Sequence, residues 1–299
     1  MLKKNFRVYK DSFAKAFIGG MTTLPVVILI LIAIGLYLRS RPIFMEKALS
    51  DVFLSSEWRP SKGSFGMFPF IAGTFWVTAI AAIIAVPLSL LSAIHLSEYA
   101  HKRVRTIARP VIDLLSGIPS VVYGVWGVLV IVPLIRLHIA PWFGVKTTGY
   151  TVLAGGIVLA IMVFPVIISV CAEVFQTVPQ GLREASLSLG ATKWQTVKHV
   201  VLRKAMPGII AAIILGISRV FGETMAVLMV VGNVIKVPHS PLDSAYPLPA
   251  LFANNYGEMM SVPLYDAALM LSAFVLLLFV VFFNVVARIV LIRIERRTA

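Results

Sequence analysis

Six long apolar runs dominate this sequence, and they restrict it to one class of fold. A helix needs about 20 apolar residues to cross the roughly 30 Å hydrocarbon core of a bilayer. Backbone groups in lipid must be paired internally, so runs of this length indicate spanning helices. We therefore predict an all-α polytopic membrane protein with about six transmembrane helices. The runs are approximately Ile18–Leu38, Phe68–Leu96, Val111–Ile135, Tyr150–Phe175, Pro207–Val231 and Leu264–Ile292.

The distribution of positive charge predicts how the spans are oriented. Of the 27 Lys and Arg residues, 18 lie in the N-terminal segment, the second and fourth connections and the C-terminal end, whereas 8 lie in the other three connections. Cytoplasmic loops carry the excess of Lys and Arg, so both termini and these two connections are expected in the cytoplasm. We expect residues 1–17 to form a cytoplasmic arm. Residues 18–299 are expected to form a single transmembrane domain whose first span is retained.

Motifs for catalysis or metal binding do not stand out in the sequence. The single cysteine, Cys171, offers neither a disulfide framework nor a thiolate metal site, and the five histidines are scattered without metal-ligand spacing. The stretch GVKTTG at residues 144–149 lacks the spacing of a nucleotide-binding P-loop. We predict no catalytic residue, no metal and no cofactor bound by this chain, so any ATP hydrolysis is expected in another subunit.

The fourth connection, residues 176–208, has the pattern of a helical hairpin. Pro179 suits the start of a helix, and Gly190 can take the positive φ that ends one helix and lets the next begin near Thr192. We predict a helix, a tight turn and a second amphipathic helix, an element suited to lie against a partner. The apolar face of the second helix is expected to hold Trp194, Val197 and Val200 or Val201.

This connection resembles the EAA loop of ATP-binding-cassette (ABC) importer permeases. The stretch EASLSLG matches the loop at Glu184, Ala185 and Gly190, with Ser186 in place of the second alanine. Leu202–Arg203 stands where the family has Leu-Pro, which leaves the end of the second helix open. The resemblance implies that the loop docks on a separate ATPase subunit. The coupling residues that it implies are Glu184, Ala185, Ser186, Gly190 and Ala191.

Three further stretches are similar to the permeases of the phosphate-specific importer, and to the PstC type more than to the paired PstA type. They are HLSEYA at 95–100, DLLSGIPSVVYGVWG at 113–127 and SRVFGETMAVLMVVGN at 218–233. The resemblance implies the type I ABC importer permease fold in a prokaryotic plasma (inner) membrane. It also implies a heterodimer with a PstA-type permease, two copies of a cytoplasmic ATPase that binds ATP and Mg²⁺, and an extracytoplasmic phosphate-binding protein.

Two charges within the fifth apolar run indicate a substrate pathway. A charged side chain near the bilayer centre costs about 2.5–3.5 kcal/mol on insertion scales, so Arg219 and Glu223 should serve a purpose. Residues four apart share one face of a helix, which predicts that these two side chains pair. We expect Arg219 to contact phosphate, with Glu223 as its counter-ion and with Thr224 and Ser120 along the same pathway. A purely structural pair that locks helices together is the alternative.

Two other functions and one further element remain open at this stage. The cargo of the same permease fold can be another oxyanion, such as sulfate or molybdate. A membrane signalling or assembly protein that does not transport can use the same loop to hold a partner. In the connection at residues 234–263, the stretch LPALFANNYGEMM at 248–260 has the composition of a short surface helix, although a plain solvated connection is equally compatible.

Overall fold

The computed structural model describes residues 2–258, 262 and 264–298, and it describes side chains for residues 14, 15, 17–258, 262, 264–286, 288, 289 and 292. Some of the Lys and Arg side chains that were counted to orient the spans, and the last two residues of LPALFANNYGEMM, lie outside these ranges. They are the side chains of Lys3, Lys4, Arg7, Lys10, Arg293, Arg296 and Arg297, and the whole of Met259 and Met260.

The described residues form helices, one small β-hairpin and the connections between these elements. The α-helices are α1 (Leu2–Glu46), α2 (Leu49–Phe53), α3 (Phe68–Ile94), α4 (Lys102–Ser116), α5 (Ser120–Trp126), α6 (Val132–Leu134), α7 (Ala140–Trp142), α8 (Val152–Thr177), α9 (Gln180–Ser188), α10 (Lys193–Thr196), α11 (Leu202–Phe221), α12 (Met225–Val230), α13 (Leu248–Asn255) and α14 (Tyr265–Thr298). Single π-helical turns occur at η2 (His95–Tyr99), η3 (Gly127–Ile131), η4 (Ile135–Ile139) and η5 (Val197–Val201). The antiparallel strands β1 (Trp58–Arg59) and β2 (Ser64–Phe65) flank the 3₁₀ turn η1 (Pro60–Lys62).

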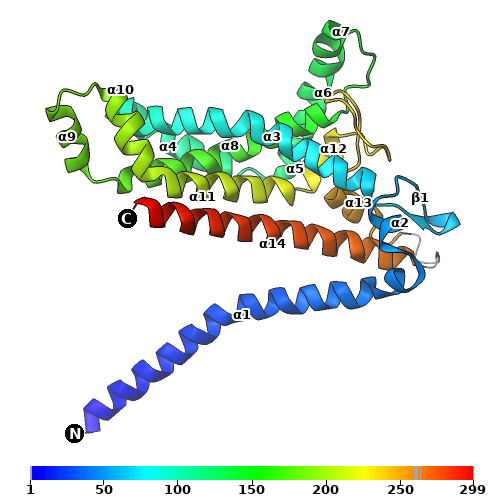
Figure 1. Cartoon of the computed structure of the whole chain (residues 1–299), viewed down its shortest axis with the longest axis horizontal. Coiled ribbons are helices and arrows are strands. Elements are labelled where there is room, and N and C mark those ends of the chain that lie inside the picture. The colour runs from blue at the N-terminus through cyan, green and yellow to red at the C-terminus, as the bar shows by residue number, and fades with distance from the viewer. Residues whose placement is uncertain (1, 259–261, 263, 299) are drawn as a thin grey trace.

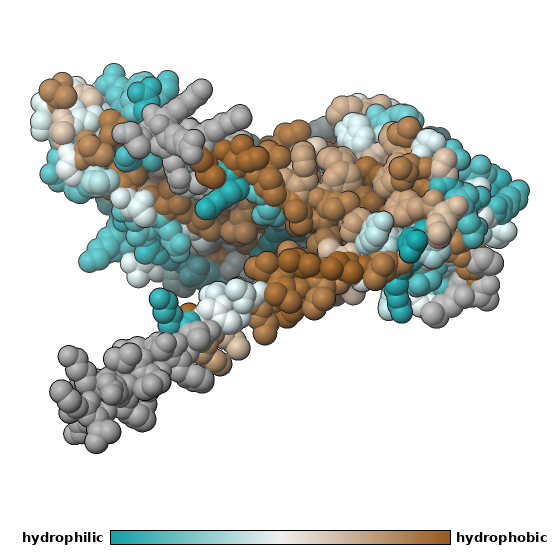
Figure 2. Space-filling model, turned by 60° about the horizontal axis from the view of Figure 1, so that its bottom comes forward, coloured by the Kyte–Doolittle hydropathy of each residue, from teal (hydrophilic) through white to brown (hydrophobic). Residues whose placement is uncertain are grey.

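The long helices lie side by side, as Figure 1 shows, and they separate two polar ends of the molecule. One end carries α9 and α10 and is called the loop end below; the other carries the β-hairpin, α2 and α13 and is called the hairpin end. Both chain termini lie toward the loop end (Figure 1). In Figure 2, hydrophobic side chains form a band across the middle, and hydrophilic side chains gather at both ends.

The structure confirms the predicted number of spans. Six segments of the described chain are long and apolar enough to cross a membrane: Phe17–Glu46, Phe68–Tyr99, Ser120–Trp142, Val152–Thr177, Lys193–Phe221 and Tyr265–Val286. The first is part of α1, which runs from Leu2 to Glu46 as a single helix, so no helix boundary separates the described residues 2–17 from the first span.

Close packing of α3 against α8 forms the centre of the molecule. Gly156 lies directly against Ile80, where an added Cβ would collide with the isoleucine side chain. A Cβ on the neighbouring Gly155 would lie 3.2 Å from Cγ1 of Val77. Small residues at such an interface let two helix backbones approach closely, which is how membrane helices gain packing contacts. The α3–α8 pair is therefore the rigid reference for the surrounding elements.

The predicted boundaries of the third and fifth spans were wrong, because both runs are interrupted. The run at Val111–Ile135 contains a break at residues 117–119 between α4 and α5, so the third span begins at Ser120 and continues to Trp142. The run at Pro207–Val231 is interrupted at residues 222–224, so its long helix ends at Phe221 and the short α12 follows. Pro87 and Pro165, in contrast, lie inside the continuous helices α3 and α8.

The hairpin end has a core of its own, built around aromatic side chains. Trp58 of β1 packs edge-on against Phe70 of α3, with ring centroids 5.0 Å apart. Asn255 of α13 donates to the Tyr246 hydroxyl at 2.8 Å and accepts from the Tyr265 hydroxyl at 2.9 Å. These bonds tie α13 to the start of α14. Of the two alternatives left open for LPALFANNYGEMM, a short helix forms over residues 248–255, and it packs into this core.

Candidate functional site

The break between α4 and α5 is held together by a buried tyrosine. Pro119 has an extended backbone conformation (ψ 140°) and precedes the first residue of α5. The hydroxyl of Tyr123 donates to the carbonyl oxygen of Leu115 at 2.8 Å, across the break. A backbone carbonyl that a break has freed needs such a partner, because an unpaired polar group is costly away from water. Tyr123 therefore stabilises this interruption of the third apolar run.

The break between α11 and α12 contains Glu223 and Thr224. The Glu223 carboxylate accepts a hydrogen bond from the Ala226 amide at 3.4 Å, at the start of α12. The Thr224 hydroxyl donates to the Gly222 carbonyl at 3.3 Å. Both polar side chains are half-buried and bond to the backbone of their own break. They therefore shape the turn between the two helices.

The two breaks are brought together by direct packing of α5 on α12. A Cβ on Gly124 of α5 would lie 3.2 Å from Cα of Ala226 and 2.7 Å from Sδ of Met229. Arg219, in the last turn of α11, is close enough to Tyr123 to interact with it electrostatically. The guanidinium is thus near Tyr123, and Ser120, half-buried, is the first residue after the α4–α5 break.

The predicted ion pair between Arg219 and Glu223 was wrong in its geometry. The relation between residues four apart holds only within a continuous helix. Here α11 ends at Phe221, and Glu223 lies beyond its end. Among the side chains that the structure describes, Arg219 forms no ion pair and is exposed, whereas the Glu223 carboxylate bonds to α12.

The turn in the connection at residues 176–208 has the predicted form. Helix α9 begins directly after Pro179, and Gly190 has φ +85°. The Gly190 amide donates to the Leu187 carbonyl at 3.0 Å, and the Ala191 amide donates to the Ser186 carbonyl at 3.3 Å. These two bonds form a Schellman motif, in which a residue with positive φ closes the end of a helix. The prediction for Gly190 is confirmed.

The second helix of the hairpin starts as predicted but has no separate end. Thr192 and Gln195 form a reciprocal capping box, with bonds of 3.3 Å and 2.8 Å. From Lys193, α10 continues through η5 into α11 and so into the fifth span. On its expected apolar face Val197 and Val201 are buried, Val200 is half-buried, and Trp194 is 52% exposed. The loop is therefore joined directly to a membrane-spanning helix.

The five residues expected to contact an ATPase lie on α9 and in its turn. The hydroxyls of Ser186 and Thr196 are 2.9 Å apart, which links α9 to α10. Glu184 and Ala185 are exposed, and Ala191 is half-buried. The loop also exposes four large apolar side chains: Leu182, Leu187, Leu189 and Trp194.

The sequence reading missed the ion pair between Arg183 and Glu98. Nη2 of Arg183 lies 2.8 Å from Oε1 of Glu98, and the two side chains are only 15% and 9% exposed. The two residues are 85 positions apart, and Arg183 was counted only among the cytoplasmic cations. The one signal in the sequence was Glu98 itself, which is part of the stretch HLSEYA.

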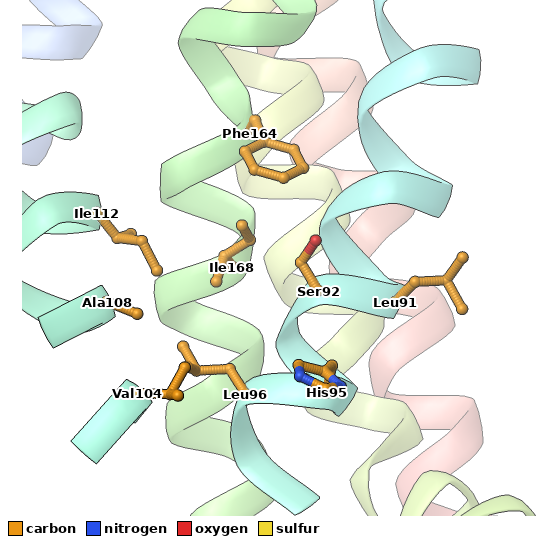
Figure 3. A pocket seen from close by; sticks show the side chains of 9 residues that line it. All are labelled: Leu91, Ser92, His95, Leu96, Val104, Ala108, Ile112, Phe164 and Ile168. Atoms are coloured by element: carbon orange, nitrogen blue, oxygen red, sulfur yellow. The ribbon is translucent and has the colours of Figure 1, made fainter. Parts of the chain in front are cut away.

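A groove of about 480 Å³ lies between α3, α4 and α8, and Figure 3 shows the side chains that line it. Ser92 and His95 are its polar members; the others are Leu91, Leu96, Val104, Ala108, Ile112, Phe164 and Ile168. An oxyanion needs charged or hydrogen-bonding donors to replace its water, and the apolar majority of this lining does not supply them. The groove is therefore a poorer candidate for anion passage than the region around Arg219.

Comparisons with known proteins place the chain in a family. Residues 85–299 match the family described as "Binding-protein-dependent transport system inner membrane component". The "Probable ABC transporter permease protein YqgH" of Bacillus subtilis (strain 168) is 42% identical over 219 residues, which cover 72% of this chain and 69% of that protein. The "Phosphate transport system permease protein PstC" of Xylella fastidiosa (strain Temecula1 / ATCC 700964) is 36% identical over 301 residues, which cover 96% of this chain and 92% of that protein.

Solved structures show the same fold. A bacterial ABC transporter involved in the import of the acidic polysaccharide alginate matches with a TM-score of 0.61 at 16% identity, over 94% of this chain and 98% of that chain. The MetNI methionine ABC transporter matches with a TM-score of 0.55 at 20% identity, over 77% of this chain and 94% of that chain.

Permeases of this family are transport subunits that work with an ATPase and a substrate-binding protein. From the family match, the identity to these relatives and the six spans, the chain belongs to the binding-protein-dependent transport system inner membrane components and is a multi-pass ABC importer permease of type I fold.

Proposed function

We propose that this chain is the PstC-type permease of an ABC importer that moves inorganic phosphate into the cytoplasm. The observation that carries the proposal is the 36% identity to a phosphate transport permease over 96% of this chain. In this proposal the partners are a PstA-type permease, two copies of a cytoplasmic ATPase and an extracytoplasmic phosphate-binding protein. ATP and Mg²⁺ bind in the ATPase, and this chain binds no cofactor. The loop end and both termini face the cytoplasm.

Arg219 is the proposed contact for phosphate. Its side chain is exposed near Tyr123 and has no carboxylate partner among the described side chains. A planar guanidinium can donate two parallel hydrogen bonds to an oxyanion, which a lysine ammonium cannot do with the same geometry. The hydroxyl of Ser120, next to the α4–α5 break, is proposed to offer a further hydrogen bond along the pathway, and that of Thr224, within the α11–α12 break, to offer another by giving up its bond to the Gly222 carbonyl. Glu223 contributes by shaping the α11–α12 turn.

The ATPase is proposed to dock on the loop end through the five coupling residues. The exposed apolar side chains of Leu187, Leu189 and Trp194 support this assignment, because a solvated loop gains nothing by displaying them. The Schellman turn at Gly190 holds α9 and α10 in a fixed relation, so the loop presents one preformed surface. In this proposal, the conformational change driven by ATP hydrolysis is transmitted through this surface to the membrane-spanning helices.

Reconstituted uptake tests the cargo and the role of Arg219 separately. The importer, purified with its companions and placed in vesicles with ATP, should take up phosphate in preference to sulfate and molybdate. Arg219→Gln should lower phosphate uptake at least tenfold, and Arg219→Lys should retain part of the uptake. Arg136→Gln is the control: Arg136 is also exposed, and uptake in this variant should stay near that of the wild type. Preference for sulfate or molybdate would assign the other cargo, and wild-type uptake in both Arg219 variants would remove Arg219 from the pathway.

A further inference from the structure

Within the coupling loop (residues 176–208), helix α9 is held to the rest of the chain by few side-chain bonds, whereas Val197 and Val201 of the following turn are buried in the core. Helix α9 has no fully buried residue. A cavity of about 800 Å³ lies beside it, lined among others by Ser97, Gln180 and Lys193. Apart from the link between Ser186 and Thr196, the side chain that leaves α9 and reaches other helices is Arg183. Besides its covalent connections to α8 and α10, α9 therefore passes movement to other helices through a small number of side-chain bonds.

Arg183 connects α9 to the ends of two other helices at once. Its Nη2 donates to the Phe175 carbonyl at 2.8 Å, and its Nη1 donates to the Val178 carbonyl at 2.5 Å, so it closes the C-terminal end of α8. Its Nη2 and Nε also donate to the two carboxylate oxygens of Glu98, at 2.8 Å and 3.3 Å. Glu98 belongs to η2, which continues α3. One guanidinium thus joins α9, α8 and α3.

The turn η2, which carries Glu98, is itself held by contacts from two other helices. Arg105, at the start of α4, donates through Nε to the Leu96 carbonyl at 3.1 Å and through Nη2 to the Ser97 carbonyl. Lys193 of α10 lies over the ring of Tyr99, 4.7 Å from its centroid. The turn that carries Glu98 is therefore fixed from α4 and from α10. Behind it lies the closely packed α3–α8 pair.

The Arg183–Glu98 ion pair is better suited to fix the relative positions of the helices than to add to the stability of the fold. A buried ion pair recovers little net stability, because both charges must leave water, but it does fix the relative placement of the groups it joins. Five donors in a rigid fork let one arginine satisfy a carboxylate and two carbonyls together, and no other side chain can do this. The geometry is therefore specific for arginine at position 183 and for an acid at position 98.

We propose that Arg183 and Glu98 are the positioning pair that passes movement of the coupling loop to the α3–α8 pair. The inference rests on the proposed function as an ATP-driven importer. When the ATPase shifts α9, Arg183 pulls on Glu98 and on the end of α8, so the two central helices move with the loop. Without the pair, α9 is joined to α8 through the two-residue connection Val178–Pro179 and to α10 through its turn, and its position relative to the α3–α8 pair is no longer fixed.

The test uses the complete importer reconstituted in vesicles. The variants are Arg183→Gln, Glu98→Gln, their combination and Arg183→Lys, with Arg59→Gln as the control, because Arg59 forms an exposed pair with Glu57 at the hairpin end. Two quantities are measured: phosphate taken up per ATP hydrolysed, and the change in backbone hydrogen exchange at residues 95–100 when the ATPase binds ATP. The second quantity does not depend on the cargo.

Each single glutamine variant should bind the ATPase and hydrolyse ATP, but phosphate uptake per ATP should fall at least tenfold. The double variant should be no worse than the worse single variant, because both remove the same link. Arg183→Lys should recover part of the ratio, and the ATP-dependent exchange change at residues 95–100 should vanish in Glu98→Gln but persist in Arg59→Gln. Glu98→Gln leaves the carbonyl bonds of Arg183 in place, so it remains informative if Arg183→Gln does not assemble.

A wild-type uptake ratio and exchange response in assembled Glu98→Gln would overturn the role of the pair, as would additive losses in the double variant. Failure of the wild-type complex to take up phosphate would overturn the proposed cargo instead. In that case the exchange response still decides whether the pair transmits movement.

Discussion

The hydroxyl of Tyr123 and the carbonyl oxygen of Leu115 are 2.8 Å apart across the α4–α5 break. This bond spans the interruption, and Arg219 is near enough to Tyr123 to interact with it electrostatically. A membrane helix that breaks must find partners for its freed carbonyls within the protein. Here a side chain from the first turn of the following helix supplies one. The break is therefore a stabilised turn at the start of the third span.

Tyr123→Phe removes this bond and leaves the Leu115 carbonyl with one partner fewer. Loss of one partly buried hydrogen bond costs about 1 kcal/mol. We expect a lower thermal midpoint for the purified protein and reduced phosphate uptake, because the α4–α5 break loosens. Thermal unfolding and vesicle uptake measure the two effects. Unchanged values in both assays would show that the break does not depend on this bond.

Gly190→Val should disrupt the turn of the coupling loop. The φ of +85° at Gly190 is strained for any residue with a Cβ, and most strongly for a β-branched one. We expect the protein to reach the membrane but to lose coupling between ATP hydrolysis and uptake. Gly181→Ala is the matched control, because Gly181 lies in α9 with open space around it and no positive φ. Equal coupling in the two variants would contradict this role for the turn.

Gly124→Leu should separate α5 from α12. A Cβ at this position already lies 3.2 Å from the Cα of Ala226, and backbone cannot move aside cheaply. Overpacking of this kind costs about 1–3 kcal/mol. We expect a lower thermal midpoint and weaker phosphate uptake. Gly117→Ala is the control, because a Cβ at this position would lie 3.5 Å from the Leu114 carbonyl oxygen, an ordinary contact. Equal thermal midpoints and equal uptake in the two variants would show that close α5–α12 packing does not matter for transport.

Asp243 should make the loop at residues 236–243 sensitive to acid. Hydrogen bonds from the His239 and Ser240 amides, at 2.9 Å and 3.0 Å, together with nearby Lys236, lower the pKa of Asp243 below its ordinary value. A group whose pKa is lower in the folded state stabilises that state above its ordinary pKa, and the contribution is lost as the pH falls through the lowered pKa. The gap in thermal midpoint between wild type and Asp243→Asn should therefore be largest near neutral pH and close on acidification.

Lys236→Gln is the control for Asp243, because it leaves both backbone bonds in place and should keep most of the pH dependence. The same loop also caps α8, since the Val152 and Leu153 amides donate to the carbonyls of Asp243 and Pro241 at 2.8 Å and 2.9 Å. Faster hydrogen exchange of these two amides in Asp243→Asn would follow. A pH-independent gap between wild type and Asp243→Asn would be incompatible with this account.

The sequence alone was sufficient for the features that depend on local composition. Six spans follow from the length and apolarity of the runs, because lipid imposes both on any helix that crosses it. The turn at Gly190 follows from one residue that tolerates positive φ, and the capping box at Thr192 and Gln195 depends on residues three apart. Each of these features is decided within a few consecutive residues or by the solvent around them.

Tertiary structure decided which charged groups meet. Arg219 and Glu223 are close in sequence, yet the end of α11 at Phe221 separates their roles, and Arg219 lies near Tyr123 instead. Arg183 and Glu98 are 85 positions apart, and only the packing of α3, α8 and α9 brings them to 2.8 Å. Helical spacing rules end where a helix ends, and contacts between distant segments depend on how whole helices pack. For that reason the number of spans and the turn at Gly190 could be predicted from the sequence, whereas the interruptions of the third and fifth runs and the partners of these arginines could not.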